Sequence, residues 1–292
     1  MPTGPQITLI GNCQVTPLST LLKTIYQVET IKLISAHLVQ DKDAEHVSSI
    51  IDQAHIVITQ HIHDLFPKQY LHTSRLKQSC KQRLLTIPNL FYRGYTPDLR
   101  YVRLKHGSTL PGPLGDYHSR ILLESWQKGC NNTTLESLYR DPELWKQRYE
   151  HTARDSINEL KKRELQLDIK ISNFIASKQS TNRLFHTFNH PGKTLLTRLA
   201  KRIGKALDLT QKSNFKQELQ GVSETLNRIQ IPIHPFTQHN LGLKFSSTEH
   251  IQSDHINGVI LKQPQQFTLL ELIQQFSLFY SSHPALMRDI KD

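Results

Sequence analysis

The chain has 292 residues, enough for one large hydrophobic core or two modest ones. Its 36 Lys and Arg against 25 Asp and Glu give a net charge of +11, and residues 151–228 alone hold 15 basic and 7 acidic residues. This excess fits a phosphorylated ligand, a nucleic acid or an anionic membrane surface and does not choose among them. Aromatic residues make up 8% of the chain, too few for a nucleic-acid stacking platform, so no nucleic-acid partner is expected.

Three cysteines without paired spacing predict neither a disulfide framework nor a structural zinc site, and we expect a reducing, cytoplasmic setting. The first residues lack the basic region of a signal peptide, and no run of about 18 apolar residues predicts a membrane span. Neither a Gly-x-x-x-x-Gly-Lys-Ser/Thr nor a Gly-x-Gly-x-x-Gly motif occurs, which argues against P-loop NTPases and Rossmann dinucleotide-binding proteins.

The N-terminal stretch predicts a strand, a tight turn and a helix. An apolar run at residues 7–10 precedes a polar turn, and a helical pattern of apolar residues follows at 18–25. The turn consists of Gly11, Asn12, Cys13 and Gln14. Thr16 is expected to cap the helix, with Pro17 at its first position. The turn would then lie beyond the carboxyl end of the first strand, where open α/β sheets bind their ligands.

Cys13 has two interpretations. Free cysteines are usually small buried hydrophobic residues. A thiol near a helix N-terminus is instead stabilised as thiolate, and two amide side chains beside it make a poor core. The sequence therefore favours Cys13 as a site residue.

Further strands are predicted at residues 30–34, 54–60 and 83–90, with a short helix at 43–53. Strands and helices alternating at these lengths are typical of a parallel sheet. Gln60 and His61 follow the third strand, so they should share one rim of the sheet with Cys13.

The remainder of the chain adds an ordered loop, a helical insertion and a second strand-to-helix junction. The loop covers residues 91–98, and Asp116 is expected to open a helix that runs to about Lys128. We predict one α/β domain over residues 1–292, with a helical insertion at about 125–180 and a helical C-terminal extension at about 207–292. A short strand at 184–188 leads into Asn189-His190-Pro191 and a basic amphipathic helix at 193–203, and another helix is expected at 267–280.

His190 is the sharpest partner for Cys13, because histidine titrates near neutral pH and can take a proton from a nucleophile. A histidine that caps a helix through backbone contacts would explain the same position. Rival histidines are His61, His63, His118 and His186. The pair His61 and His63 with Asp64 resembles a metal-ligand run, but no third ligand is fixed by spacing, and we expect no metal.

Five motifs in order resemble the WcbI family of capsular-polysaccharide biosynthesis proteins. They are Gly11-Asn12-Cys13-Gln14, Thr59-Gln60, Gly94-Tyr95-Thr96-Pro97-Asp98, Gly115-Asp116-Tyr117-His118 and Phe188-Asn189-His190-Pro191. The resemblance covers about residues 6–200 and includes a distant likeness to SGNH hydrolases. It implies an SGNH-like three-layer core with a parallel sheet, and a CoA-dependent enzyme that O-acetylates a sugar of a surface polysaccharide.

The resemblance also implies roles for individual residues. The expected catalytic residues are Cys13, His190, Gln14, Asn12 and Gln60, the three amides donating to the developing oxyanion. The expected coenzyme-binding residues are Gly11, Tyr92, Arg93, Tyr117, His118, Asn189, Lys193 and Arg198, with Arg93, Lys193 and Arg198 meeting the phosphates. Acetyl-CoA and a carbohydrate acceptor are the expected partners, and contact with membrane-associated polysaccharide machinery is compatible with this function.

In the SGNH pattern an acid lies three residues before the late histidine. Thr187 occupies that place here, which leaves Asp98 or Asp116 as substitutes. Whether Cys13 attacks the thioester itself, or His190 activates the sugar hydroxyl for direct attack, stays open. Two other functions also stay open: an SGNH-like carbohydrate esterase, and a non-catalytic module that binds an anionic glycan or nucleic acid through the basic segment.

Overall fold

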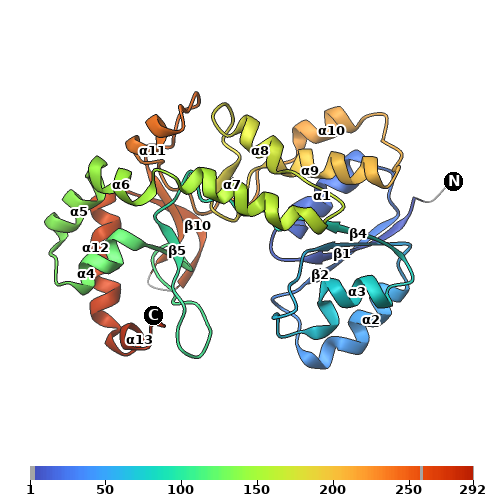
Figure 1. Cartoon of the computed structure of the whole chain (residues 1–292), viewed down its shortest axis with the longest axis horizontal. Helices are drawn as coiled ribbons and strands as arrows, with labels where there is room; N and C mark the ends of the chain where they lie inside the picture. The colour runs from blue at the N-terminus through green and yellow to red at the C-terminus, as the bar shows by residue number, and fades with distance from the viewer. Residues whose placement is uncertain (1–3, 257–258, 292) are drawn as a thin grey trace. The chain divides into compact units, whose positions relative to one another are not determined.

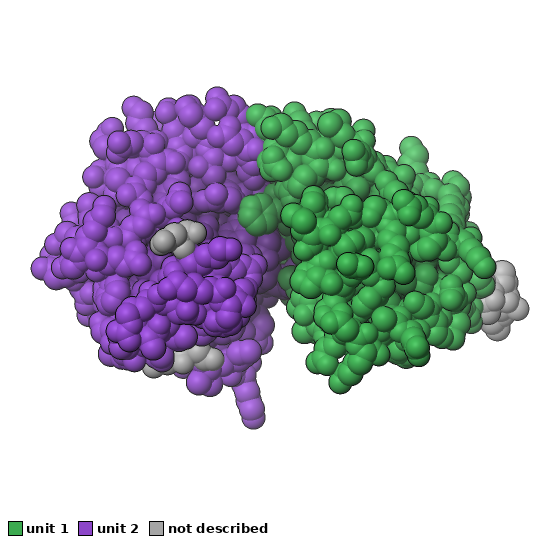
Figure 2. All heavy atoms as spheres, turned by 60° about the horizontal axis from the view of Figure 1, so that its bottom comes forward, with its two compact units in different colours: residues 1–91, 157–177, 191–225 green, residues 92–156, 178–190, 226–292 purple. Residues whose placement is uncertain are grey.

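The structure is a computed structural model that describes residues 4–256 and 259–291, and its chain forms two compact units (Figure 2). Unit 1 comprises residues 1–91, 157–177 and 191–225, and unit 2 comprises residues 92–156, 178–190 and 226–292. Each unit is described by itself. The assignment of the chain to one domain with an insertion and an extension stays a prediction.

Unit 1 is built on a four-stranded parallel sheet with the strand order β2-β1-β3-β4. Its strands are β1 (Gln6–Gly11), β2 (Thr30–Ser35), β3 (Ile56–Gln60) and β4 (Arg83–Ile87). The central strands β1 and β3 carry almost continuous runs of buried residues, as expected for parallel strands covered on both faces. The predicted parallel sheet is confirmed.

Helices cover both faces of this sheet (Figure 1). One face carries α1 (Val15–Ile25), α9 (Lys193–Ala206) and α10 (Phe215–Gly221), and the other carries α2 (Ala44–Asp52) and α3 (Thr73–Ser79). On the second face, Ile10 and Ile34 of the sheet pack with Val47 and Ile51 of α2 and Leu76 of α3. The predicted three-layer arrangement is therefore present in unit 1, which also contains the short 3₁₀ helices η1 (Asp41–Asp43), η2 (Gln69–Leu71) and η3 (Glu164–Gln166).

Unit 2 combines short antiparallel strand pairs with helices. The pairs are β5 (Leu99–Tyr101) with β6 (Tyr117–Ser119), and β9 (Ile251–Ile256) with β10 (Val259–Phe267). The helices are α4 (Arg120–Gln127), α5 (Asn132–Arg140), α6 (Pro142–Tyr149), α11 (Pro235–Asn240), α12 (Leu269–Ser282) and α13 (Pro284–Arg288). Both units receive residues from α7 (Thr152–Arg163), α8 (Ser172–Lys178) and the pair β7 (Phe185–Thr187) and β8 (His190–Pro191).

The helix expected to open at Asp116 begins four residues later, at Arg120. The Ser119 hydroxyl caps it by accepting a hydrogen bond from the Leu122 amide, whereas the Asp116 carboxylate accepts one from the Thr109 hydroxyl. The intervening residues form β6 and pair with β5. The prediction was wrong because a three-residue strand is too short to leave a periodic pattern.

The helix expected from residue 267 begins at Leu269. Phe267 still belongs to β10, and Thr268 forms a capping box with Glu271, in which each side chain accepts a hydrogen bond from the other residue's backbone amide. Within the described ranges, no helix has both the length and the apolar character needed to cross a membrane.

Candidate active site

The turn between β1 and α1 is held by the side chain of Gln60, which reaches over it from the end of β3. The Gln60 Oε1 atom accepts a hydrogen bond from the Asn12 backbone amide at 2.8 Å. A Cβ atom at Gly11 would lie only 2.3 Å from this oxygen and 2.6 Å from a Val15 methyl group, so the crossing requires glycine at position 11. The predicted meeting of Gln60 with the turn around Cys13 is confirmed.

A network of amide side chains continues from this crossing. The Gln60 Nε2 atom donates to the Gln14 Oε1 atom at 2.8 Å, and the Gln14 Nε2 atom donates to the Leu90 carbonyl oxygen at 2.7 Å. The Leu90 amide returns a hydrogen bond to Gln14, and the Asn12 side chain donates to Asn89. Gln14 and Gln60 are 1% and 2% exposed. These contacts assign both glutamines to fixing the turn, and their role as oxyanion donors stays a prediction.

The first turn of α1 differs from the expected one. The helix begins at Val15, and Thr16 does not cap it. The Asn12 side-chain oxygen instead accepts a hydrogen bond from the Gln14 amide, and the Asn12 carbonyl oxygen accepts one from the Val15 amide. The predicted cap was wrong because the preceding turn is shaped by Gln60, a residue far away in the sequence.

Cys13 is partly buried in this turn. Burial raises the pKa of the Cys13 thiol above the ordinary value, and a backbone hydrogen bond only partly offsets the rise. Burial therefore opposes the thiolate that the helix N-terminus is expected to favour, and the role of Cys13 as a nucleophile stays a prediction.

In unit 2, three predicted site residues come together. The Tyr117 hydroxyl donates a hydrogen bond to the Asn189 side-chain oxygen at 2.6 Å and lies 3.1 Å from the His190 Nε2 atom. The Asn189 Nδ2 atom donates to the Tyr101 hydroxyl at 2.8 Å, and the rings of Tyr101 and Tyr117 stack. The motifs around residues 117 and 189 therefore form one polar cluster, which is supported by the stacked rings of Tyr101 and Tyr117.

The cluster determines which nitrogen of His190 is basic. The Tyr117 hydroxyl hydrogen is used in its short contact with Asn189, so its oxygen is left to accept a hydrogen bond from the Nε2–H group of His190. The Nδ1 atom then carries the lone pair, and it is buried without a hydrogen-bond partner. Burial, together with the charge of His186, lowers the pKa of His190 to about 4. His190 is therefore neutral at pH 7 and able to accept a proton at Nδ1.

Neither proposed acid substitute supports His190 by a hydrogen bond. The Asp98 carboxylate is buried and accepts hydrogen bonds from the Ile121 amide and the Tyr149 hydroxyl, and Asp116 is bonded to Thr109. The acid partner of His190 therefore stays a prediction, without a supporting contact among the described residues. Sequence reasoning also missed Asp254, whose negative charge favours protonated His190 and which is bonded to Arg228 and His255. No local pattern could have connected Asp254 to His190.

Three further predicted coenzyme-binding residues lie in unit 2, two of them (Tyr92 and His118) buried and one (Arg93) partly buried. His118 is 0% exposed, with Nδ1 2.9 Å from the Tyr280 hydroxyl and Nε2 3.1 Å from the Leu110 carbonyl oxygen. The buried Tyr92 hydroxyl is bonded to Gln179, and the Arg93 guanidinium donates to the Pro97 carbonyl oxygen at 2.7 Å. These contacts give all three residues structural roles, and coenzyme binding by them stays a prediction.

The remaining predicted phosphate contacts lie on α9 in unit 1. The Lys193 ammonium donates to the Val222 carbonyl oxygen, and its backbone amide donates to Glu224. Arg198 is exposed, with its guanidinium 5.5 Å from the centre of the Phe174 ring. Their contact with coenzyme phosphates stays a prediction, as does the convergence of Cys13 and His190 on one site.

Among the described residues, no three His, Cys, Asp or Glu side chains form a group that could hold a metal ion. His61 and His63 lie near each other, with ring centres 6.4 Å apart, but the His63 Nδ1 atom accepts a hydrogen bond from the Leu65 amide. Burial, aided by the nearby His63 and Lys77, lowers the pKa of His61.

Comparisons with known proteins agree with the motifs. Residues 6–212 match the family model of the polysaccharide biosynthesis enzyme WcbI. A solved structure of WcbI, described as a novel polysaccharide biosynthesis enzyme, has a TM-score of 0.76 at 18% identity and covers 98% of this chain and 92% of its own. It is described as the native protein without a disulfide bond between CoA and one of its cysteines. A search of curated proteins finds no match.

Proposed function

Because the chain belongs to the WcbI family of polysaccharide biosynthesis enzymes, we propose that it transfers the acetyl group of acetyl-CoA to a hydroxyl group of a carbohydrate. In this reaction the hydroxyl oxygen attacks the thioester carbonyl carbon, and the bond between that carbon and the CoA sulfur breaks. The hydroxyl proton passes through a base to the departing sulfur. The products are an acetyl ester and free CoA.

The observation that carries this proposal is the position of Cys13 in a turn that the side chains of Gln60 and Gln14 hold in place. Cys13 lies beyond the carboxyl ends of parallel strands, where α/β proteins bind ligands, and within the part of the chain that matches the family model. The solved WcbI structure is described as lacking a disulfide bond between CoA and one of its cysteines, and we take this wording to mean that CoA and that cysteine are neighbours in that protein. By analogy, the coenzyme sulfur would lie beside Cys13.

We favour direct transfer over an acetylated cysteine. The nucleophilic form of cysteine is the thiolate, and burial raises the pKa of Cys13, so little thiolate is present at neutral pH. Cys13 would then pack against the thioester and exclude water from it. The acceptor hydroxyl would be the attacking group.

His190 is the candidate base for that hydroxyl. Its neutral imidazole has a buried and unbonded Nδ1 atom, while its Nε2 atom is held by Tyr117. A positioned base contributes about 100-fold to 10,000-fold to such a reaction. This role requires Cys13 and His190 to serve the same active site.

Two measurements test the proposal: calorimetric titration with CoA, and release of CoA from acetyl-CoA in the presence of a panel of sugars. We expect CoA binding in the wild-type protein, a loss of CoA release of at least about 100-fold in His190→Ala, and substantial remaining activity in Cys13→Ser. The control is Cys80→Ser, a substitution in unit 1 outside the turn. Full activity in both site variants would remove Cys13 and His190 from the mechanism. Hydrolysis of acetylated sugars without CoA binding would favour the esterase.

A further inference from the structure

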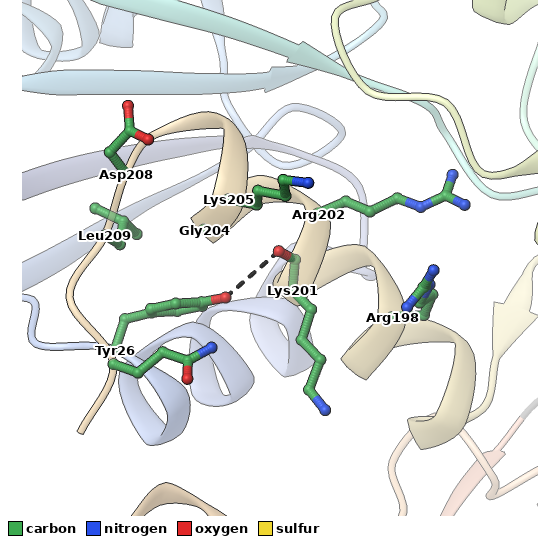
Figure 3. A pocket seen from close by; sticks show the side chains of 9 residues that line it. Tyr26, Arg198, Lys201, Arg202, Gly204, Lys205, Asp208 and Leu209 are labelled. Carbon is green, nitrogen blue, oxygen red and sulfur yellow. Dashed lines mark hydrogen bonds between the residues drawn. The ribbon is translucent and has the colours of Figure 1, made fainter. Parts of the chain in front are cut away.

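Cationic side chains line a pocket beside the C-terminal part of α9, entirely within unit 1. The pocket has a volume of about 530 Å3. Figure 3 shows the side chains that line it, most of which come from the second half of α9 and the segment after it. The ionisable residues among them are Tyr26, Arg198, Lys201, Arg202, Lys205 and Asp208. Four cationic side chains and one carboxylate thus line the pocket.

One wall of the pocket is a tyrosine that packs closely against α9. Tyr26 follows the last residue of α1 and is 2% exposed. A Cβ atom at Gly204 would lie 2.0 Å from the Tyr26 ring, so glycine at position 204 is what allows the ring to lie against α9. The Tyr26 hydroxyl donates to the Lys201 carbonyl oxygen at 3.4 Å (Figure 3). This contact gives the pocket a rigid wall.

Three of the four cations are held by neighbouring groups. The Arg198 guanidinium lies over the Phe174 ring, the Lys201 ammonium lies 5.9 Å from the centre of the Phe215 ring, and Arg202 donates to the Lys170 carbonyl oxygen. Side chains that are already ordered lose less entropy when they bind a ligand. Burial lowers the pKa of Arg202, and the positive charge of Arg198 adds to this effect; a bound anion would oppose the contribution of Arg198.

The helix dipole does not explain this cluster. Cations stabilise a helix C-terminus only within its last turn, and Lys205 is the one basic residue that α9 has there. Arg198 and Lys201 lie earlier in the helix. Their position beside the pocket is therefore not set by the helix dipole, and they belong to the polar face of this amphipathic helix.

The pocket is distinct from the turn that contains Cys13. Tyr26 lies at the C-terminal end of α1 and Cys13 just before its N-terminal end. This helix has 11 residues, which corresponds to a length of about 16 Å. The pocket and the thiol are thus at opposite ends of one helix.

From these observations we infer that the α9 pocket binds a diphosphate group of a ligand separate from the coenzyme. A diphosphate carries at least two negative charges in a compact form, and arginine and lysine are the standard partners of phosphate oxygens. The pocket is also larger than the group itself, which leaves room for what the diphosphate carries. Activated sugars in solution and sugars on lipid carriers share this chemistry.

The test is calorimetric titration of the full chain with inorganic pyrophosphate. We expect saturable binding that weakens with added salt and becomes at least ten-fold weaker in the double variant Lys201→Gln/Lys205→Gln. The matched control, Lys32→Gln/Lys42→Gln, removes two exposed charges of unit 1 that do not line the pocket and should bind like wild type. Thermal melting of both variants verifies that they are folded.

Binding measurements with other ligands identify the source of the diphosphate and separate this inference from the proposed function. UDP-glucose represents a soluble source, and phosphatidylcholine vesicles with a polyprenyl diphosphate represent a lipid source; loss of either interaction in the pocket variant supports the inference. CoA binding should be unchanged in that variant, and its loss would make the pocket part of the coenzyme site. Absence of pyrophosphate binding, equal weakening in the control, or binding only to phosphatidylglycerol vesicles would overturn the inference.

Discussion

Gln60 donates a side-chain hydrogen bond to Gln14 at 2.8 Å, and both amides are buried. Gln60→Ala removes this donor and also the acceptor of the Asn12 amide. Because buried polar groups left without partners are costly, we expect a loss of about 1 to 3 kcal/mol in the free energy of unfolding, measured by urea denaturation. Gln53→Ala, which removes an exposed amide of unit 1, should cost much less. Equal losses in the two variants would contradict the structural role of Gln60.

Gly11→Ala tests the crossing of Gln60 over the turn. The new Cβ atom would meet the Gln60 side chain and Val15, so we expect a destabilisation of roughly 1 to 3 kcal/mol. Gly221→Ala is the matched control, since a Cβ atom there meets nothing within 4 Å. In the Gln60→Ala background one of the two clashes disappears, and Gly11→Ala should cost less. Additive effects in the double variant would show that the two residues are not coupled.

Acid should destabilise the protein through its buried histidines. Burial lowers the pKa of His118 and His190 to about 4, whereas an unfolded histidine titrates near 6.5. Between these values the unfolded state binds more protons, so stability falls as the pH drops from about 6.5 to about 4, by roughly 3 kcal/mol per histidine. Denaturation at several pH values measures this slope.

His118→Gln gives that prediction a specific control. The variant is less stable at every pH because it loses contacts with Tyr280 and Leu110. Its unfolding between about pH 6.5 and about pH 4 should take up about one proton fewer than that of the wild type, so its stability changes less with pH. If the free energy of unfolding of the variant changed with pH as steeply as that of the wild type, the pKa of His118 would not be lowered in the folded protein.

The reactivity of Cys13 is a further test. Because burial raises its pKa, alkylation of Cys13 by iodoacetamide should be slow at pH 7 and should accelerate with pH beyond the range typical of free cysteine. Mass spectrometry of the labelled peptides measures the rate, with Cys80 and Cys130 in the same chain as comparison thiols. Fast labelling of Cys13 at pH 7 would instead indicate a stabilised thiolate and restore the acetyl-cysteine route.

Tyr117→Phe should release His190 from its fixed tautomer. In the wild type, nitrogen-15 NMR should find the proton on Nε2, because the Tyr117 oxygen is its acceptor. Without the hydroxyl we expect a mixture of tautomers and an acetyl-transfer rate lower by about ten-fold. Tyr101→Phe, which removes the acceptor of the Asn189 amide and keeps the Tyr117 hydroxyl, should leave the tautomer in place. A wild-type proton on Nδ1 would contradict the assignment.

Local patterns predicted the sheet of unit 1 well. The apolar runs that end at Gly11 and Gln60 are long enough to reveal parallel strands, and the carboxyl ends of such strands meet at one edge. The details that local patterns did not indicate depend on distant partners. Thr16 does not cap α1 because Gln60 shapes the turn, and His118 is buried against Tyr280, 162 residues further along the chain. The spacing of residues in a sequence motif does not predict contacts between residues so far apart in the chain.

The same limit applies to the surroundings of His190. The sequence indicated the polar junction at residues 189–191 and the motif at Tyr117, and the structure brings these together. It could not indicate that Thr187 would bond to Tyr117 and Asn189, or that the nearby negative charge would come from Asp254. Those relationships are set by the packing of segments that are remote in the chain.

The chain passes between the two units after residues 91, 156, 177, 190 and 225. Consequently no single proteolytic cut releases either of them whole, and neither corresponds to a continuous fragment that could be expressed alone. During synthesis the sheet of unit 1 leaves the ribosome long before α9, which covers one of its faces. Until about two-thirds of the polypeptide has emerged, α1 is the only one of the three helices on that face that is present, and the part that α9 and α10 will cover stays open.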